Sequence, residues 1–349
     1  MTVMPRDLLA VVADDQPAVL EALTEFLKAR SWRVVPCADG GEALSAIRSR
    51  TPDLVIVDAS MPVLSGIDVI RHLRFVCGKP RIPALIITGR SDPRILREAA
   101  RAGAHEVLTK PFRLSHLNEI IVSLTQGPPR LPRNLDLGYD STACLELLLG
   151  AGDRHAQPRL EALGRAISLL ARAVDHHDPH GSFHSLQVAE LASLTAASLG
   201  LSRKELPELR LAGLAHDVGK LLLPGPILSG TETPSERDWE VIRSHPEQGH
   251  ELLQPLVQGA AEAVLHHHER WDGGGYPKGL AGESIPQGAR ILSVVESYAA
   301  MTSRTRYGEP LGPQEALEVL RREAGSQFDP SVVQAFGRLV EEPAPCSVS

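Results

Sequence analysis

The sequence predicts two domains of different fold class, an α/β domain followed by an all-α domain. Its 349 residues exceed the length of one average domain. Residues 8–125 alternate short β-rich runs with helical segments, which is typical of a doubly wound parallel sheet. Beyond residue 158 the apolar spacing is helical and shows no strand alternation. We expect domains at 1–125 and 158–342, a linker at 126–157 and a tail at 343–349.

Composition excludes two classes of partner. The net charge of -7 leaves no dominant basic surface that could neutralise a phosphate backbone, so DNA is not expected as a partner. The apolar runs have strand length, well short of the roughly 20 residues that cross a bilayer, so no membrane partner is expected. No export signal is recognisable, and the four cysteines lack ligand spacing. These features predict a cytoplasmic protein with reduced thiols.

Polar residues end four of the five β-rich runs of the expected sheet. The runs are LLAVVA, WRVVPC, LVIVD, ALIIT and EVLTK, and the residues are Asp14, Asp15, Asp58, Thr88 and Lys110. The carboxyl ends of parallel strands meet at one edge, so these side chains should lie together. Three carboxylates repel one another unless a cation lies among them, and oxygen ligands suit Mg²⁺. One carboxylate could then act as a nucleophile toward phosphorus, with the cation and the lysine neutralising charge.

This pattern resembles the flavodoxin-like receiver domain of two-component response regulators over nearly all of the first 125 residues. The resemblance implies that Asp14 and Asp15 hold Mg²⁺ and that Asp58 accepts a phosphoryl group from a cognate sensor histidine kinase. It also implies that Thr88 and Lys110 bind the phosphoryl oxygens.

One position departs from the receiver pattern. Three residues before the lysine, where the family usually has a switch Tyr or Phe, this chain has Val107. A valine has no aromatic ring to move into the space beside Thr88. We therefore expect a modest conformational response to phosphorylation.

Histidine is concentrated in the second half of the chain. Ten of the 14 histidines lie between His176 and His268. Three of them run together at 266–268, in an expected helix, and continue into Glu269, Asp272 and a glycine turn. A His216-Asp217 doublet lies upstream, also at an expected helix position. A mixed imidazole and carboxylate ligand set suits Zn, Mn or Fe, so the sequence predicts a site for one or two metals.

The motifs HDVGK, HP at 245–246, HHERWDGGGYPKGL and a later ARI helix resemble the HD-GYP family of the HD phosphohydrolase superfamily, from Asp175 to Phe336. The resemblance implies an all-α HD-type fold that hydrolyses cyclic di-GMP at a centre of two, or three, Fe or Mn ions. It implies the metal ligands His184, His216, Asp217, His245, His267, His268 and Glu296, with His180 as a further candidate.

Two residues are expected to carry the chemistry of this centre. A metal pair needs a short bridging carboxylate, a role we assign to Asp217, and it lowers the pKa of a shared water. Lys220, three residues later, should reach the phosphate. Tyr276 belongs to a turn that, in the family, borders the site and is linked to diguanylate cyclases (GGDEF proteins). The residues assigned to substrate binding are Lys220, Tyr276, Arg304 and Arg306.

Several positions depart from the family, so two functions stay open. The DxxDA motif becomes Glu296 to Ala300, with Ala299 in place of its second acid, and the substrate arginines fall on Gln187 and Thr305. The first hypothesis is a response regulator, expected as a homodimer, whose phosphorylation at Asp58 controls a slow cyclic di-GMP phosphodiesterase. The alternative is a degenerate HD-GYP adaptor that binds metal, nucleotide or a partner protein without turnover.

Overall fold

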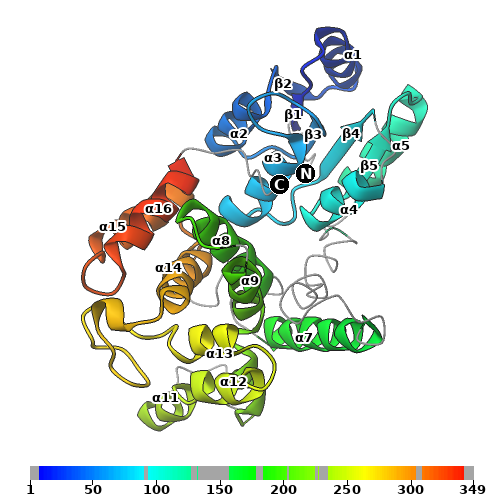
Figure 1. Cartoon of the computed structure of the whole chain (residues 1–349). Helices are drawn as coiled ribbons and strands as arrows, with labels where there is room; N and C mark the ends of the chain where they lie inside the picture. The colour runs from blue at the N-terminus through cyan, green and yellow to red at the C-terminus, as the bar shows by residue number, and fades with distance from the viewer. Residues whose placement is uncertain are drawn as a thin grey trace. The chain divides into compact units, whose positions relative to one another are not determined.

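The β-rich runs of the first 125 residues form a five-stranded parallel sheet in the computed structural model (Figure 1). The strands run in the order β2-β1-β3-β4-β5, which confirms the predicted doubly wound class. Their bounds are β1 Leu9–Ala13, β2 Arg33–Cys37, β3 Leu54–Asp58, β4 Ala84–Thr88 and β5 Glu106–Thr109. The structure describes residues 8–89, 93–126, 132, 157–177, 184–202, 204–224, 227, 235–303 and 309–341.

Helices cover both faces of this sheet. They are α1 Pro17–Lys28, α2 Gly40–Ser49, α3 Gly66–Arg71, the π-helix η1 His72–Val76, α4 Pro93–Arg101 and α5 Leu114–Thr125. Val11 faces a core built with α2, α3, η1 and α4, whereas its neighbours Ala10 and Val12 face a core built with α1 and α5. Successive strand residues point to opposite faces of the sheet, and both faces are buried. The strand sequences are therefore continuous apolar runs without alternation.

The chain divides into two compact units, residues 1–138 with 343–349, and residues 139–342. The described part of the second unit is helical, as predicted. Its elements are α7 Gln157–His177, α8 His184–Ser198, α9 Glu205–Ala215, the 3-10 helix η3 Val218–Leu222, α11 Glu236–Ile242, α12 His245–Leu253, α13 Gln258–Leu265, the 3-10 helix η4 Gly282–Ser284, α14 Gln287–Thr302, α15 Pro313–Arg322 and α16 Pro330–Glu341. Within the described ranges no helix has both the length and the apolar character needed to cross a membrane.

Two glycines allow the close helix packing that brings the predicted metal ligands together. A Cβ on Gly213 in α9 would come within 2.6 Å of Ala189 Cα in α8. A Cβ on Gly219 in η3 would collide with the carbonyl oxygen of His245 at the start of α12. The absence of a side chain at these two positions therefore lets three ligand-bearing segments approach one another.

The helical positions predicted for two histidine motifs are wrong. Helix α13 ends at Leu265, and His266 to His268 follow it in a turn. Successive helical residues point about 100° apart, so a turn is needed to aim His267 and His268 at one point. Similarly α9 ends at Ala215, and Asp217 (φ -99°, ψ 6°) leads into η3.

Candidate functional site

The polar strand ends of the sheet meet around Lys110, as predicted. Its ammonium nitrogen lies 2.7 Å from Asp14 Oδ2 and 2.7 Å from Asp58 Oδ1. Thr88 ends the adjacent strand and is buried, and its carbonyl oxygen accepts a hydrogen bond from the Lys110 amide. Asp15 follows Asp14 and is exposed. The five predicted residues thus lie at one sheet edge, with one lysine joining two carboxylates.

The charges at this edge stabilise each other. Burial lowers the pKa of Lys110, but hydrogen bonds with Asp14 and Asp58 and the charges of both carboxylates outweigh burial and raise it. Asp58 Oδ2 also accepts a hydrogen bond from the Ser60 amide at 2.7 Å. Asp58 keeps 7% of its surface exposed. Its bonds with Lys110 and the Ser60 amide hold the carboxylate in place at the edge of the protein core.

Val107, at the position of the switch aromatic, lies in β5 and is partly buried. It packs against the core formed with α2, α3, η1 and α4. Its side chain therefore contributes to packing of the sheet.

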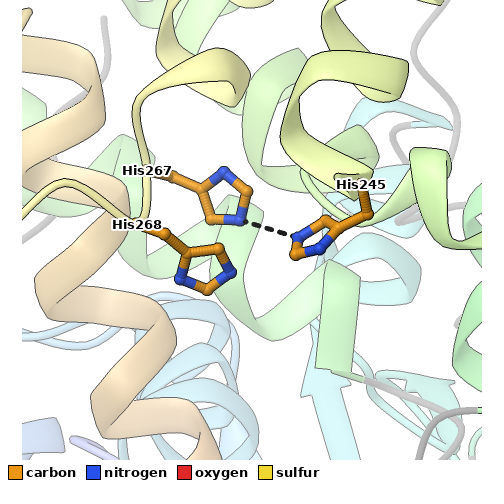
Figure 2. Close-up of side chains that lie close together, drawn as sticks. All are labelled: His245, His267 and His268. Carbon is orange, nitrogen blue, oxygen red and sulfur yellow. Dashed lines mark hydrogen bonds between the residues drawn. The ribbon is translucent and has the colours of Figure 1, made fainter. Parts of the chain in front are cut away.

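Three histidines come together from two segments of the helical unit. His245 begins α12, and His267 and His268 lie in the turn after α13. Figure 2 shows the three rings facing a common space, and one ligand atom from each lies within 4.8 Å of the others. The Nε2 atoms of His245 and His267 are 3.4 Å apart. We call this set the first ligand group.

A second ligand group contains His184, His216 and Glu296. His184 is the first residue of α8, His216 follows α9, and Glu296 lies on α14. Their ligand atoms also lie within 4.8 Å of one another. Glu296 Oε2 is 3.9 Å from His267 Nε2, which places the second group beside the first.

Asp217 lies between the two ligand groups. Its Oδ2 is 3.3 Å from His216 Nε2 in the second group, and its Oδ1 is 3.3 Å from His245 Nε2 in the first. Lys220 Nζ lies 2.6 Å from Oδ2. One carboxylate thus presents an oxygen to each group, which is the geometry of a bridging ligand.

Backbone carbonyls fix the direction of the histidine rings. In three of them Nδ1 is hydrogen-bonded to the carbonyl oxygen three residues earlier. These pairs are His216 with Gly213 at 2.8 Å, His245 with Ile242 at 2.7 Å and His267 with Val264 at 2.6 Å. With Nδ1 as the donor, Nε2 of the neutral His245 and His267 carries the lone pair and points into the cluster, as in metal-binding histidines generally.

Burial keeps the first ligand group neutral. It lowers the pKa of His245 to about 4, and together with neighbouring imidazoles it lowers the pKa values of His267 and His268 well below the ordinary value. Neutral imidazole is the form that binds a metal. The first group is therefore ready to bind at neutral pH without losing protons.

Asp217 and His216 form a charged pair. Burial raises the pKa of Asp217, but the Lys220 and His216 charges outweigh it and hold that pKa well below its ordinary value. Burial lowers the pKa of His216, but the Asp217 carboxylate outweighs it and raises that pKa to about 9. In the metal-free protein His216 therefore carries a proton that a bound cation would displace.

Two buried atoms at the centre support a metal pair. Among the described residues, His216 Nε2 and Asp217 Oδ1 have no hydrogen-bond partner although both are buried. A buried polar atom without a partner costs free energy, which a bound cation would recover. Six imidazole and carboxylate side chains in two groups with a shared carboxylate fit a pair of divalent ions.

The glycine turn after the histidines covers one side of the site. The Tyr276 ring stacks on His268 with centroids 4.9 Å apart at 28°, and the Arg243 guanidinium carbon lies 5.7 Å from the Tyr276 ring centroid. Glu269 is buried and accepts hydrogen bonds from the amides of Lys278 and Leu280. It therefore holds the turn closed rather than orienting a ligand ring.

Sequence reasoning missed one supporting acid. Asp175 is buried near the end of α7, and its Oδ1 accepts hydrogen bonds from the Ser185 amide (3.0 Å) and hydroxyl (2.6 Å). This contact fixes the start of α8 beside His184. The sequence feature that could have identified Asp175 is its position directly after Val174, at the end of the apolar positions of an expected helix. His180, Arg304 and Arg306 lie outside the described residues.

Comparison with known proteins agrees with this division. Residues 10–122 match the family model of the response regulator receiver domain, and residues 168–332 match that of the HD domain. Both matches fall inside the predicted domains, whose exact boundaries stay predictions.

Long relatives share both parts. The chain is 32% identical over 334 residues to "Cyclic di-GMP phosphodiesterase response regulator RpfG" of Xanthomonas campestris pv. campestris, covering 94% of this chain and 86% of that protein. It is 30% identical over 339 residues to "Cyclic di-GMP phosphodiesterase" of Thermotoga maritima, covering 95% and 90%. The chain belongs to the family of two-component response regulators that join an N-terminal receiver domain to a C-terminal HD domain of the HD-GYP type.

Proposed function

We propose that this chain hydrolyses a phosphodiester bond of cyclic di-GMP under the control of phosphorylation at Asp58. The observation that carries the proposal is the position of Asp217, whose two oxygens each lie 3.3 Å from a histidine of a different ligand group. Metal pairs that cleave phosphate esters work at a spacing of about 3.5–4 Å, which a shared carboxylate can set. The named activity of both long relatives supports cyclic di-GMP as the substrate.

The proposed ligands divide into two sets around Asp217. One ion would be held by His245, His267 and His268, and the other by the second ligand group, His184, His216 and Glu296. Nitrogen-rich sets with a carboxylate favour Fe or Mn over Mg. A bound metal pair supplies an ionised water at neutral pH. His180 stays a proposed ligand of a third ion.

Lys220 has a defined part in this proposal. It is bonded to Asp217 Oδ2 at 2.6 Å, and its side chain keeps 22% of its surface exposed. The ammonium group therefore holds the carboxylate in its bridging orientation and presents positive charge at the accessible side of the site. A phosphate that approaches there meets a cation without further rearrangement. Tyr276, Arg304 and Arg306 stay proposed substrate contacts.

Glu296 favours hydrolysis over the binding-only alternative. The longer acid stands where the family has aspartate, and its carboxylate is within 4.8 Å of the ligand atoms of His184 and His216. Ala299, which lacks the acid of the motif, is fully buried in the apolar packing of α14. The loss of that acid leaves both ligand groups complete.

In the receiver domain, the proposed phosphoryl acceptor is Asp58 and the proposed Mg²⁺ ligands are Asp14 and Asp15. Lys110, already hydrogen-bonded to Asp58, would remain beside the phosphoryl oxygens. A sensor histidine kinase is the expected donor, as the receiver family implies.

Two protein contacts complete the proposal. The turn around Tyr276 is the proposed contact for diguanylate cyclases. The proposed homodimer is supported by α7, which exposes 63% of Leu169 and 43% of Leu170. Leu169→Glu should then lower the dimer fraction in sedimentation.

The deciding experiment incubates the full chain, loaded with Mn²⁺ or Fe²⁺ and with metal content verified, with cyclic di-GMP and resolves the products. We expect slow release of the linear dinucleotide or GMP by the wild type and none by Asp217→Asn. Nucleotide binding without any turnover by the loaded wild type would establish the adaptor instead.

A further inference from the structure

Arg243 lies near the Tyr276 ring, which stacks on His268 of the first ligand group. It caps the C-terminus of α11, two residues before His245, and is exposed. Among the described residues no carboxylate pairs with its guanidinium group. The neighbouring arginines differ, because Arg270 pairs with Asp272 and Arg290 with Asp329. The chain therefore keeps one arginine charge available beside this site.

Tyr276 holds that charge in place. The guanidinium carbon of Arg243 lies 5.7 Å from the ring centroid, a cation–π distance, and the ring itself stacks on His268. The Tyr276 amide also donates to the carbonyl oxygen of His268 at 3.2 Å. The series Arg243, Tyr276 and His268 thus connects an exposed cation to a metal-ligand ring through fixed contacts.

The substrate class assigned above has two phosphodiester groups in one ring. Only one of them can occupy the metal centre at a time, and the other remains as an anion a short distance away. Lys220, bonded to Asp217, would meet the phosphate that lies at the metal pair. Arg243 offers a planar pair of donors outside it, a geometry that matches two phosphate oxygens.

We propose that Arg243 binds the phosphodiester group that is not being cleaved, with Tyr276 as the residue that positions its guanidinium. The inference rests on the proposed function, since it presupposes a cyclic dinucleotide at the metal centre. It assigns to α11 an anchoring role that compensates for the arginines absent at Gln187 and Thr305.

This contact is present both before and during cleavage, so its loss should weaken binding and leave the chemical step intact. For Arg243→Gln we expect KM for cyclic di-GMP to rise about 10- to 100-fold, the loss typical of one charge-assisted contact, with kcat within about 3-fold. Arg243→Lys should recover only part of the affinity because it lacks the paired donors.

The test compares two substrates in the Mn²⁺-loaded full chain. Bis(p-nitrophenyl) phosphate has a single phosphodiester, so its hydrolysis should be the same in the wild type and Arg243→Gln. Arg237→Gln, an exposed arginine on the same helix, is the matched control and should leave both substrates unaffected. Equal losses on both substrates would overturn the proposal, since Arg243 would then act through the metal centre.

Calorimetric binding of cyclic di-GMP and cyclic di-AMP separates phosphate from base recognition. A phosphate contact predicts the same fold loss of affinity for both nucleotides in Arg243→Gln, and a loss confined to cyclic di-GMP would overturn it. A loaded wild type that cleaves bis(p-nitrophenyl) phosphate but not cyclic di-GMP would refute the proposed function. In that case the binding measurement would still decide the role of Arg243.

Discussion

Both domains place a lysine on a buried carboxylate, but the atoms around the two pairs differ. Lys110 lies 2.7 Å from Asp58 at the sheet edge, and Lys220 lies 2.6 Å from Asp217 in the helical domain. Beside Asp58 the next charged group is another carboxylate, Asp14, which the same lysine also contacts. Around Asp217 the neighbours are imidazole nitrogens.

This difference predicts that the two domains favour different classes of metal. Carboxylate oxygens alone attract a hard ion such as Mg²⁺ and leave room for phosphoryl oxygens. Neutral imidazoles around one carboxylate give a softer set that retains transition metals. A lysine–carboxylate pair therefore does not define a site's chemistry, and the neighbouring donors do.

The largest effect is expected from Asp217→Asn, which removes the charge shared by both ligand groups. Catalytic rate should fall at least about 10³-fold, because the metal pair loses its bridging anion. Elemental analysis should show the loss of at least one metal equivalent. Glu240→Gln, which neutralises an exposed acid on α11, is the control. Full metal occupancy in Asp217→Asn would mean that the two groups bind independently.

Asp58→Asn tests the lysine–carboxylate pair of the receiver domain. The amide keeps the shape of the side chain but cannot accept a phosphoryl group, so labelling by acetyl phosphate with Mg²⁺ should fall by at least about 10²-fold. Glu119→Gln, an exposed acid on α5, should label normally. Label that persists on Asp58→Asn would show that another carboxylate is the acceptor.

Because Val107 packs into the core, we expect beryllofluoride to change dimerisation only modestly.

Lys220→Met tests whether Lys220 acts mainly on the carboxylate of Asp217 or on the phosphate of the substrate. If it mainly presents charge to the phosphate, kcat should fall about 10²-fold while metal content stays unchanged. Loss of metal in parallel with activity would instead assign it to holding Asp217. The same comparison in Lys110→Met, scored by labelling, would show whether the two lysines have equivalent roles.

The sequence predicted the sheet and the grouping of the candidate ligands more completely than the contacts between segments. Asp58 and Lys110 follow strand-length apolar runs, so topology alone brings them together. The candidate histidines were identified through their motifs, yet their turn geometry was not, because helical spacing continues up to Leu265. The contact of Arg243 with Tyr276 has no sequence period, since packing brings α11 against a turn more than 30 residues away.

The burial of Arg74 in the π-helix η1 is a second feature that the sequence pattern does not predict. Arg74 in η1 is fully buried and donates hydrogen bonds to the carbonyl oxygens of Gly103 and Lys79, at 2.8 Å each. A charged side chain inside an apolar pattern predicts a surface position. Only the tertiary structure supplies the carbonyl oxygens that make its burial tolerable.

The smallest effect is expected at Asp329, a carboxylate–cation pair outside either site. Its oxygens accept hydrogen bonds from Arg290 and from Ser331 at the start of α16. Burial raises the pKa of Asp329, but the bonds from Ser331 and Arg290 outweigh it and lower that pKa. At neutral pH, Asp329→Asn should lower the free energy of unfolding by about 1.5–3 kcal/mol, the contribution of a hydrogen bond to a charged group.

The lowered pKa of Asp329 also predicts how the difference in unfolding free energy changes with pH. A carboxylate with a depressed folded-state pKa stabilises fully above its unfolded pKa of about 3.9 and loses that contribution as pH falls through the folded value. The difference between the wild type and Asp329→Asn should therefore be constant from pH 8 to about pH 5 and shrink below about pH 4. Urea unfolding followed by tryptophan fluorescence is suitable, because Trp271 lies 5.8 Å from the Arg290 guanidinium. Glu251→Gln, which neutralises an exposed acid on α12, is the control. A difference that grows on acidification would show that Asp329 is protonated in the native protein and that its pair with Arg290 does not stabilise the fold.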